Sequence, residues 1–348
     1  MIEFHLETSS RARTAIRCGD FLRGDFGPVP RTVLIVVDRA AASAHRERID
    51  AVRATCPASV IREVDGGEAS KALAFVESLW TTLAEARIDR NGVVVAVGGG
   101  ALLDAAAFAA ATWLRGVDLI LVPTTLTGQV DAGLGGKSAV NFGSLKNQVG
   151  VIRAPFALWV DTGFLASLPE SEWVSGLGEV AKTALLAGDP LWTRTLQDAA
   201  ALRSRDPARL SAVVEASLRF KASVVRDDPF DDGRRMILNA GHTLGHVLES
   251  AAMRRDVPMP HGVAVSIGLH LESRVVPGFD IEAVRRMTAA LGLPSEPPFR
   301  VSRDEAIDAL AGDKKRRGAS IRVPVVEAPG VVSFHAASPD ALAAAFED

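Results

Sequence analysis

The stretch Val93-Val94-Val95-Ala96-Val97-Gly98-Gly99-Gly100 decides the fold class of this chain. Its first five residues are all apolar, which is typical of a parallel strand buried on both faces. The three glycines let the backbone approach a phosphate, and the alanine-rich helix expected through Ala111 would add the positive end of its dipole. The spacing is not G-x-G-x-x-G, so the Rossmann fingerprint is absent and a plain tight turn remains the alternative.

The same alternation of strand and helix surrounds this turn. Apolar strand patterns at 33–37, 59–64 and 119–122 alternate with helical patterns at 40–54 and 70–86. This order predicts an open parallel sheet that binds its ligand at the carboxyl ends of the strands.

Helical patterns dominate the chain from about residue 163. They cover 189–202, 207–225, 237–252, 262–275, 281–291 and 303–310, and strand patterns nearly vanish until 321–326 and 331–334. We therefore predict an α/β N-terminal nucleotide-binding domain over residues 1–161 and an all-α C-terminal domain, mainly helical throughout, over residues 162–348.

Composition limits the class of protein. The chain has 348 residues, of which 48% are apolar and 23% charged, as in ordinary globular enzymes. A net charge of −3 provides no basic surface for nucleic acid, the apolar runs are too short to cross a membrane, and the N-terminus lacks a secretory signal pattern. Cys18 and Cys56 cannot form a disulfide framework. We expect a cytoplasmic enzyme with a small-molecule substrate and no nucleic-acid or membrane partner.

Three of the seven histidines lie close together in the sequence. His242 and His246 are four residues apart and would share one face of a helix, whereas His261 follows two prolines where a new helix would start. Two imidazoles and a carboxylate from elsewhere can form a catalytic divalent-metal site. Buried structural histidines are the alternative.

Charged residues with apolar neighbours are further candidates. Glu179 and Lys182 are three apart on a predicted apolar helix, and Lys221 has similar surroundings, so these side chains are expected to be paired or to bind metal or substrate. One of Arg234 and Arg235 is expected to point towards the histidine face.

The glycine-rich segment 131–138 is expected to be a flexible loop that carries Lys137. Lys146 and Asn147 follow it, and two lysines with an asparagine on mobile backbone suit a phosphate or carboxylate. Ordinary loop lysines are the alternative.

Several polar residues near the strand ends could contact a nucleotide. Asp104 follows the glycine turn, and Thr124 and Thr125 end a strand, although each could instead cap a helix. Glu68 and Lys71 could equally form a solvated ion pair at a helix start.

The order of the motifs resembles that of the 3-dehydroquinate synthases, within the sugar phosphate cyclase superfamily. From about Val93 to Arg317 the chain contains, in this order, GGGALLD, RGVDLILVPTTL, QVDAGLGGKSAVN, KNQVG, GLGEVAK, FKASVVRDDP, RRMILNAGHTLGH, PHG and GDKK. The set as a whole carries the resemblance, since no single motif is specific.

The resemblance implies a dehydroquinate synthase-like fold and two cofactors. A zinc or cobalt ion would be held by Glu179, His242 and His261. NAD would be bound in the N-terminal domain by residues that match the family's cofactor positions, namely Asp38, Glu68, Lys71, Gly99, Gly100, Asp104, Thr124, Thr125, Lys137 and Lys146.

The resemblance also implies a set of catalytic residues, namely Asp131, Lys137, Lys182, Lys221, Arg235, Asn239 and His246. His246 would bind the substrate phosphate rather than the metal. Further substrate contacts would come from Arg115, Asn147 and Lys314, with Arg115 reaching into the neighbouring subunit of a homodimer.

The implied reaction belongs to the shikimate pathway. 3-Deoxy-D-arabino-heptulosonate 7-phosphate would become 3-dehydroquinate and phosphate by transient oxidation with NAD, phosphate elimination, reduction and aldol cyclisation, which makes the enzyme a carbon–oxygen lyase. Lys221 with Arg235 favours a substrate carboxylate. The alternatives are cyclases of the amino-dehydroquinate, 2-epi-5-epi-valiolone or 2-deoxy-scyllo-inosose type, a metal-dependent polyol dehydrogenase, and an inactive NAD-binding scaffold.

Overall fold

The computed structural model of the chain describes residues 1–9, 12–143, 145–311, 316–317 and 320–347. Its packing divides the chain into two compact units. The N-terminal unit comprises Met1–Leu168 with Lys221–Phe230, and the C-terminal unit comprises Pro169–Phe220 with Asp231–Asp348. A boundary near Asp161 remains a prediction.

The N-terminal unit is built on a seven-stranded sheet of order β1-β2-β9-β6-β5-β3-β4, in which β3, β4, β5 and β6 contain the four predicted strand patterns. All neighbours in it are parallel except β1 and β2, which form an N-terminal hairpin that the sequence patterns did not predict. The strands are β1 Ile2–Ser9, β2 Ala12–Cys18, β3 Val33–Asp38, β4 Ser59–Val64, β5 Val93–Gly98, β6 Asp118–Pro123 and β9 Ala157–Val160.

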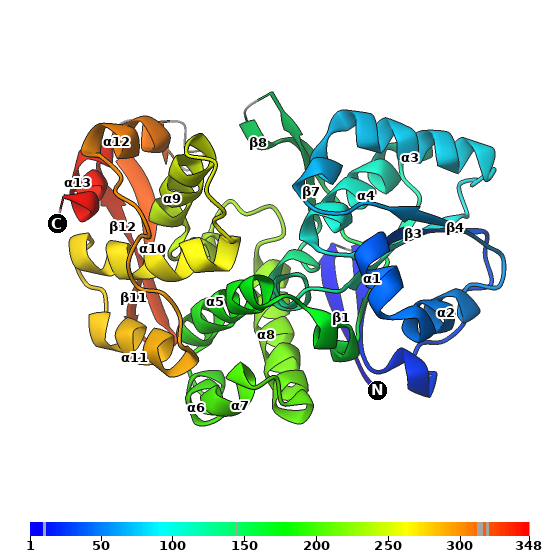
Figure 1. Cartoon of the computed structure of the whole chain (residues 1–348), viewed down its shortest axis with the longest axis horizontal. Helices are drawn as coiled ribbons and strands as arrows, with labels where there is room; N and C mark the ends of the chain where they lie inside the picture. Colours follow the sequence, from blue (N-terminus) through cyan, green and yellow to red (C-terminus); the bar gives the residue numbers. More distant parts are fainter. Residues whose placement is uncertain (10–11, 144, 312–315, 318–319, 348) are drawn as a thin grey trace. The chain divides into compact units, whose positions relative to one another are not determined.

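Helices connect β3 to β4, β4 to β5 and β5 to β6 (Figure 1). The helix predicted over 40–54 is divided at His45 into two. The α-helices are α1 Arg39–Ala44, α2 Arg46–Ala54, α3 Leu73–Glu85 and α4 Gly100–Thr112, and the short turns are η1 Phe21–Arg23, η2 Glu68–Lys71, η3 Trp113–Arg115, η4 Gly128–Ala132, which is π-helical, and η5 Thr162–Ser167.

The chain reverses its direction across the sheet between β3 and β5. It leaves β3 to form β4 on one side and then returns to form β5 on the other, with β3 hydrogen-bonded to both. The carboxyl ends of β3 and β5 therefore form a topological switch point, which is where open α/β sheets bind ligands.

The glycine loop predicted over 131–138 ends before Lys137, so the expectation that a loop carries this lysine was wrong: Lys137 begins a β-hairpin. β7 Lys137–Phe142 pairs antiparallel with β8 Leu145–Ile152. Ser138 and Val140 are buried in alternation with more exposed neighbours, which is a strand period. A Cβ on Gly150 would lie 2.1 Å from the Ser138 carbonyl oxygen, so this glycine allows close approach of the two strands rather than flexibility.

The C-terminal unit is mainly helical, as predicted. Its α-helices are α5 Glu170–Ala187, α6 Leu191–Gln197, α7 Ala199–Arg203, α8 Pro207–Asp227 (whose end counts with the N-terminal unit), α9 His242–Arg254, α10 His261–Val275, α11 Ile281–Leu291, α12 Arg303–Ala311 and α13 Pro339–Ala343, and its short turns are η6 Arg234–Asn239 and η7 Ala344–Phe346. Among the described residues, no helix has both the length and the apolarity to span a membrane.

A small sheet adds to the all-α expectation for this unit. β10 Arg316–Arg317, β11 Ser320–Ala328 and β12 Val331–Ala337 pair antiparallel, and the latter two contain the late strand patterns of the sequence. Val323 and Val325 of β11 are buried in a cluster with apolar residues of α9 and α10. The ribbons of β11, α9 and α10 can be followed in Figure 1. The strands thus support the helices that carry the histidines.

Glycines allow three helices of this unit to cross at very short range. A Cβ on Gly262 of α10 would lie 1.8 Å from the carbonyl oxygen of Ser175, and one on Gly178 of α5 would lie 2.1 Å from the carbonyl oxygen of Gly262. On the other side of α10, a Cβ on Gly268 would lie 2.0 Å from the carbonyl oxygen of Gly241, which precedes α9. Backbone contact of this kind brings residues beside these glycines together.

Candidate active site

Glu179, His242 and His261 come together in the C-terminal unit. Glu179 lies inside α5, and the two histidines are the first residues of α9 and α10. One ligand atom from each lies within 4.8 Å of the others. Glu179 Oε1 is 3.3 Å from His261 Nε2 and 4.0 Å from His242 Nε2. One carboxylate and two imidazoles that converge in this way are the donor set of a catalytic zinc or cobalt site with open positions.

The second nitrogen of each of these imidazoles has a partner. His242 Nδ1 lies 3.1 Å from the carbonyl oxygen of Ala240, and His261 Nδ1 lies 3.4 Å from Glu249 Oε1. These contacts turn both Nε2 atoms towards Glu179, because the two nitrogens of one ring point in different directions.

The electrostatics of the cluster favour positive charge. Burial lowers the pKa of His261, but the hydrogen bonds that its ring donates to the carboxylates of Glu179 and Glu249 outweigh this effect and raise the pKa to about 10. The carboxylates that stabilise a proton on this ring would also stabilise a divalent cation.

Lys182 forms a buried ion pair with Glu179. Its Nζ lies 2.5 Å from Glu179 Oε2, and both side chains are almost completely buried. The apolar neighbours of this pair in α5 explain why it is shielded from solvent, as the sequence pattern indicated.

His246 has a different environment from the other two histidines. It shares a face of α9 with His242, at a ring-centroid distance of 5.5 Å, but its side chain is 48% exposed. Its Nε2 lies 3.9 Å from Glu249 Oε2. This exposure leaves the imidazole accessible to a solute, which suits the predicted role in binding phosphate.

Two further predicted residues of this unit, Arg235 and Asn239, precede α9. Arg235 is buried and Asn239 is half-buried in η6, whereas Arg234 is exposed. Lys314 lies outside the described residues.

In the N-terminal unit, predicted cofactor residues lie at the switch point. Asp38 ends β3, Gly99 and Gly100 follow β5, and the backbone N–H of Thr124 after β6 donates to the carbonyl oxygen of Gly98 at 2.9 Å. A Cβ on Gly99 would lie 3.2 Å from the Cγ2 atom of Thr125. Any residue other than glycine would therefore crowd this turn, so the backbone is left open to a phosphate.

A polar network joins the other predicted cofactor residues. Lys71, only 5% exposed, contacts the Asp104 carboxylate at 2.5 Å and also donates to Asn147 Oδ1. Asn141 donates to Glu68 Oε1 at 2.7 Å and accepts from the Asn147 N–H at 2.9 Å. Burial raises the pKa of Asp104, although Lys71 opposes this shift. The network links η2, α4 and the β7–β8 hairpin.

Asp131 and Lys221 form a second ion pair in this unit. Lys221 Nζ lies 2.6 Å from Asp131 Oδ1 and donates to the Asp131 carbonyl oxygen at 2.6 Å. Gln129 holds the backbone of η4 in place, because its buried Nε2 donates to the carbonyl oxygens of Pro123 at 3.1 Å and Asp161 at 2.9 Å. Asp131 is thereby fixed relative to the ends of β6 and β9.

The last predicted residues are exposed cations. Lys137 begins β7 and Lys146 lies near the start of β8. Arg115 ends η3 with a φ of 65°, a left-handed conformation that an arginine rarely adopts.

Three polar residues of these clusters escaped the sequence reasoning, namely Asn141, Glu249 and Glu272. Glu272 is fully buried and accepts from the N–H groups of Gly241 at 2.8 Å, Thr243 at 2.9 Å and Leu244 at 3.2 Å. A glutamate within the apolar pattern of 262–275 was a usable signal. Asn141 ends a recognised motif, and Glu249 follows His246 by one helical turn.

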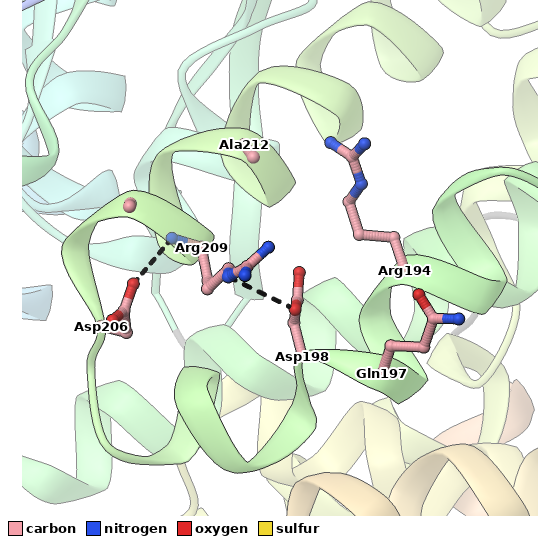
Figure 2. Close-up of a pocket in the computed structure, with 7 residues that line it drawn as sticks. Arg194, Gln197, Asp198, Asp206, Arg209 and Ala212 are labelled. Carbon is pink, nitrogen blue, oxygen red and sulfur yellow. Dashed lines mark hydrogen bonds and ion pairs between the residues drawn. The ribbon is translucent and has the colours of Figure 1, made fainter.

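A cavity of about 520 Å³ lies apart from the predicted residues (Figure 2). It is lined by Arg194, Gln197, Asp198, Asp206, Ala208, Arg209 and Ala212. Arg209 Nε lies 3.6 Å from Asp198 Oδ1, and Asp206 accepts from the Arg209 N–H at 2.9 Å, as the dashed lines in Figure 2 show. Two acidic and two basic side chains balance there, so the cavity has no charge preference for a ligand.

The chain has solved counterparts with the same fold. A 2-deoxy-scyllo-inosose synthase complexed with carbaglucose-6-phosphate, NAD⁺ and Co²⁺ is 22% identical, with a TM-score of 0.87 and 99% of each chain covered. The 2-epi-5-epi-valiolone synthase from Streptomyces hygroscopicus, with NAD⁺ and Zn²⁺ bound, is 24% identical, with a TM-score of 0.85 and 98% of each chain covered. A glycerol dehydrogenase from Schizosaccharomyces pombe is 16% identical, with a TM-score of 0.65 and coverage of 99% of this chain and 91% of that one. At these identities the likeness of the whole chain shows the fold.

Sequence comparisons identify the family. Residues 61–175 match the family model for the 3-dehydroquinate synthase N-terminal domain, and residues 176–316 match that for the C-terminal domain. The 3-dehydroquinate synthase of Thermobifida fusca is 39% identical over 81% of this chain and 77% of its own length. That of Halorhodospira halophila is 37% identical over 85% of this chain and 84% of its own length. The chain therefore belongs to the 3-dehydroquinate synthase family.

Proposed function

We propose that this chain is a 3-dehydroquinate synthase, a lyase that converts 3-deoxy-D-arabino-heptulosonate 7-phosphate into 3-dehydroquinate and phosphate. Membership of the family supports this activity. The structural observation that carries the proposal is the convergence of Glu179, His242 and His261. Close backbone contacts between their three helices hold these side chains together.

Zinc or cobalt is the metal that fits these three residues. The donor set is one carboxylate oxygen and two imidazole nitrogens, and solved relatives contain Co²⁺ or Zn²⁺. A bound divalent ion would supply Lewis-acid polarisation of a substrate oxygen. Lys182, held beside Glu179, would place an ammonium group where negative charge develops on the substrate.

NAD is the proposed second cofactor, and its chemistry would be the reversible acceptance of a hydride. Gly99 and Gly100 would offer backbone N–H groups to its phosphates, and Asp38 would accept from a ribose hydroxyl at the switch point. The network around Lys71 and Asp104 would orient the remainder of the nucleotide. Both solved synthases contain NAD⁺.

The cationic side chains account for an acidic, phosphorylated substrate. Lys221, oriented by Asp131, and the buried Arg235 are proposed to bind the carboxylate. The substrate phosphate is proposed to be bound by exposed polar side chains, namely His246, Lys137, Lys146 and Asn147. Asn239 is proposed as a further substrate contact. Charge on the substrate thus matches charge on the chain.

A cytoplasmic homodimer is part of the same proposal. Apolar side chains on and beside the β7–β8 hairpin are exposed, namely Phe142, Val149, Val151, Ile152 and Phe156, and a second subunit would cover them. Arg115, which is exposed and has a left-handed backbone conformation, is proposed to reach the neighbouring subunit.

Release of inorganic phosphate tests the proposal. The protein, loaded with zinc or cobalt and catalytic NAD, is expected to release phosphate from the heptulosonate phosphate over many turnovers without accumulation of NADH. Sedoheptulose 7-phosphate, which lacks the carboxylate, serves as the comparison. Preference for the latter would indicate a valiolone-type cyclase, and stoichiometric NADH from a polyol would indicate a dehydrogenase; either result would overturn the proposed activity.

A further inference from the structure

Glu249 lies between two histidines to which the proposed function assigns different tasks. Its Oε1 is 3.4 Å from Nδ1 of His261, and its Oε2 is 3.9 Å from Nε2 of His246. The side chain is only 18% exposed. Each oxygen of one carboxylate therefore faces a different imidazole.

Helix geometry fixes this position. His246 and Glu249 are three residues apart on α9 and so lie on one face, while His261 begins α10. The two helices touch along their backbones, since a Cβ on Gly245 would lie 3.0 Å from the carbonyl oxygen of Ala264. Glu249 is thus held by rigid elements rather than by a loop.

The contact at Nδ1 determines which nitrogen of His261 is presented to a metal. With Nδ1 facing Glu249, Nε2 faces Glu179 Oε1 at 3.3 Å. A carboxylate that accepts from the far nitrogen of a ligating histidine fixes its tautomer and ring rotation and increases its basicity. His242 differs, because a neutral backbone carbonyl, that of Ala240, faces its Nδ1.

We propose that Glu249 is a positioning residue that orients the metal ligand His261 through one oxygen and the phosphate-binding His246 through the other. One carboxylate then links the metal to the binding of the substrate's phosphoryl group. This inference rests on the proposed function.

The experiment compares the wild type with Glu249→Gln and Glu249→Ala. Zinc and cobalt affinities are measured on the metal-free protein by competition with a chelator, and the cobalt absorption spectrum reports ligand geometry. Loss of the carboxylate is expected to weaken metal binding by about 10- to 100-fold and to alter the spectrum. With saturating metal, KM for the heptulosonate phosphate is expected to rise several-fold.

A further variant tests the contact of Glu249 with His246 separately from its contact with His261, and a second variant is the control. His246→Asn is expected to raise KM while leaving the metal affinity within about two-fold of the wild type, because the proposed function assigns the metal to Glu179, His242 and His261. Glu296→Gln removes an exposed carboxylate that pairs with Arg274 at the far end of α10, and is the matched control that should change neither quantity.

Wild-type metal affinity and an unchanged cobalt spectrum in folded Glu249→Gln would overturn the inference. Because glutamine has nearly the size of glutamate, the metal affinity and spectrum of Glu249→Gln test the inference even where Glu249→Ala fails to fold. Failure of the wild type itself to bind metal or to release phosphate would instead reject the proposed function, so the two failures are distinguishable.

Discussion

The carboxylate of Glu272 accepts a hydrogen bond from the backbone N–H of Gly241 at 2.8 Å, so a side chain of α10 caps the helix that begins with His242. The N–H groups of Thr243 and Leu244 donate to the other oxygen. Gly241 has no side chain with which to cap α9, and a buried carboxylate also suits the positive end of the helix dipole.

Glu272→Ala is therefore expected to lower the free energy of unfolding by about 3–5 kcal/mol, because three buried donors lose their acceptor. Chemical denaturation measures this loss, and amide exchange should quicken at residues 241, 243 and 244. The control is Asp65→Ala, which removes an exposed carboxylate paired with Arg39 and should cost about 0.5 kcal/mol or less. Equal stability of the two variants would contradict the capping role.

Glu179→Ala and His261→Ala are each expected to abolish metal retention and turnover. Each substitution leaves two protein donors, which is too few to hold a zinc or cobalt ion against buffer. Metal analysis after dialysis checks this, with His246→Ala as the variant that should keep its metal. A full complement of metal in both Glu179→Ala and His261→Ala would reject the ligand assignment.

Gly262→Ala is expected to destabilise the C-terminal unit by more than about 3 kcal/mol. The new Cβ would lie 1.8 Å from the carbonyl oxygen of Ser175, and backbone atoms on both helices must move to make room. Gly27→Ala is the control for replacing a glycine by alanine without a steric clash, because its Cβ would meet nothing closer than 3.9 Å. Thermal unfolding that is the same for both variants would show that the close crossing is not required.

Much of this arrangement follows from local sequence patterns. The apolar run before Gly98 indicated β5, and the four-residue spacing of His242 and His246 indicated a shared helix face, since both depend only on residues close in sequence. The convergence of Glu179 with the histidines was implied by the family resemblance alone, because backbone contact between distant helices leaves no periodic pattern.

The wrong and the missed predictions also concern contacts between segments that are distant in the sequence. The glycine-rich segment 131–138 was interpreted as a flexible loop that carries Lys137, whereas Lys137 and Ser138 belong to β7, which pairs with the more distant β8. Glu249 and Glu272 were missed because a glutamate on a helix is usually solvated. The apolar pattern around Glu272 indicated its burial, but the partners that Glu272 and Glu249 have on a neighbouring helix are identified only by tertiary packing.

Lys221→Ala is expected to impair turnover of the carboxylate substrate far more than that of an analogue without the carboxylate. The ammonium group, held 2.6 Å from Asp131 Oδ1, is proposed to pair with the substrate carboxylate, and only the acid can lose this interaction. The measurement is kcat/KM for both substrates in the wild type and the variant, with an expected difference of about 10- to 100-fold. Equal losses on both would reject the carboxylate role and leave Lys221 as a structural partner of Asp131.

His270 is expected to make folding sensitive to acid. Its Nε2 lies 2.8 Å from Thr288 Oγ1 between α10 and α11. Burial, followed by the repulsion of Arg274, lowers its pKa from 6.5 to about 4, with Arg285 acting in the same sense and Glu296 against them. The unfolded chain therefore takes up this proton at a higher pH than the folded protein does.

The stabilising effect of neutral His270 is thus complete above pH 6.5, declines as the pH falls towards 4, and is fully lost below that value. His270→Gln keeps a hydrogen-bonding group but cannot titrate, so subtracting its unfolding free energy from that of the wild type cancels the carboxylates common to both. The difference should fall with acid by at most about 1.4 kcal/mol per pH unit between these limits. Urea unfolding at intervals from pH 7.5 to 4.5 measures it, and a difference independent of pH would show that His270 gains its proton as readily in the folded protein as in the unfolded chain.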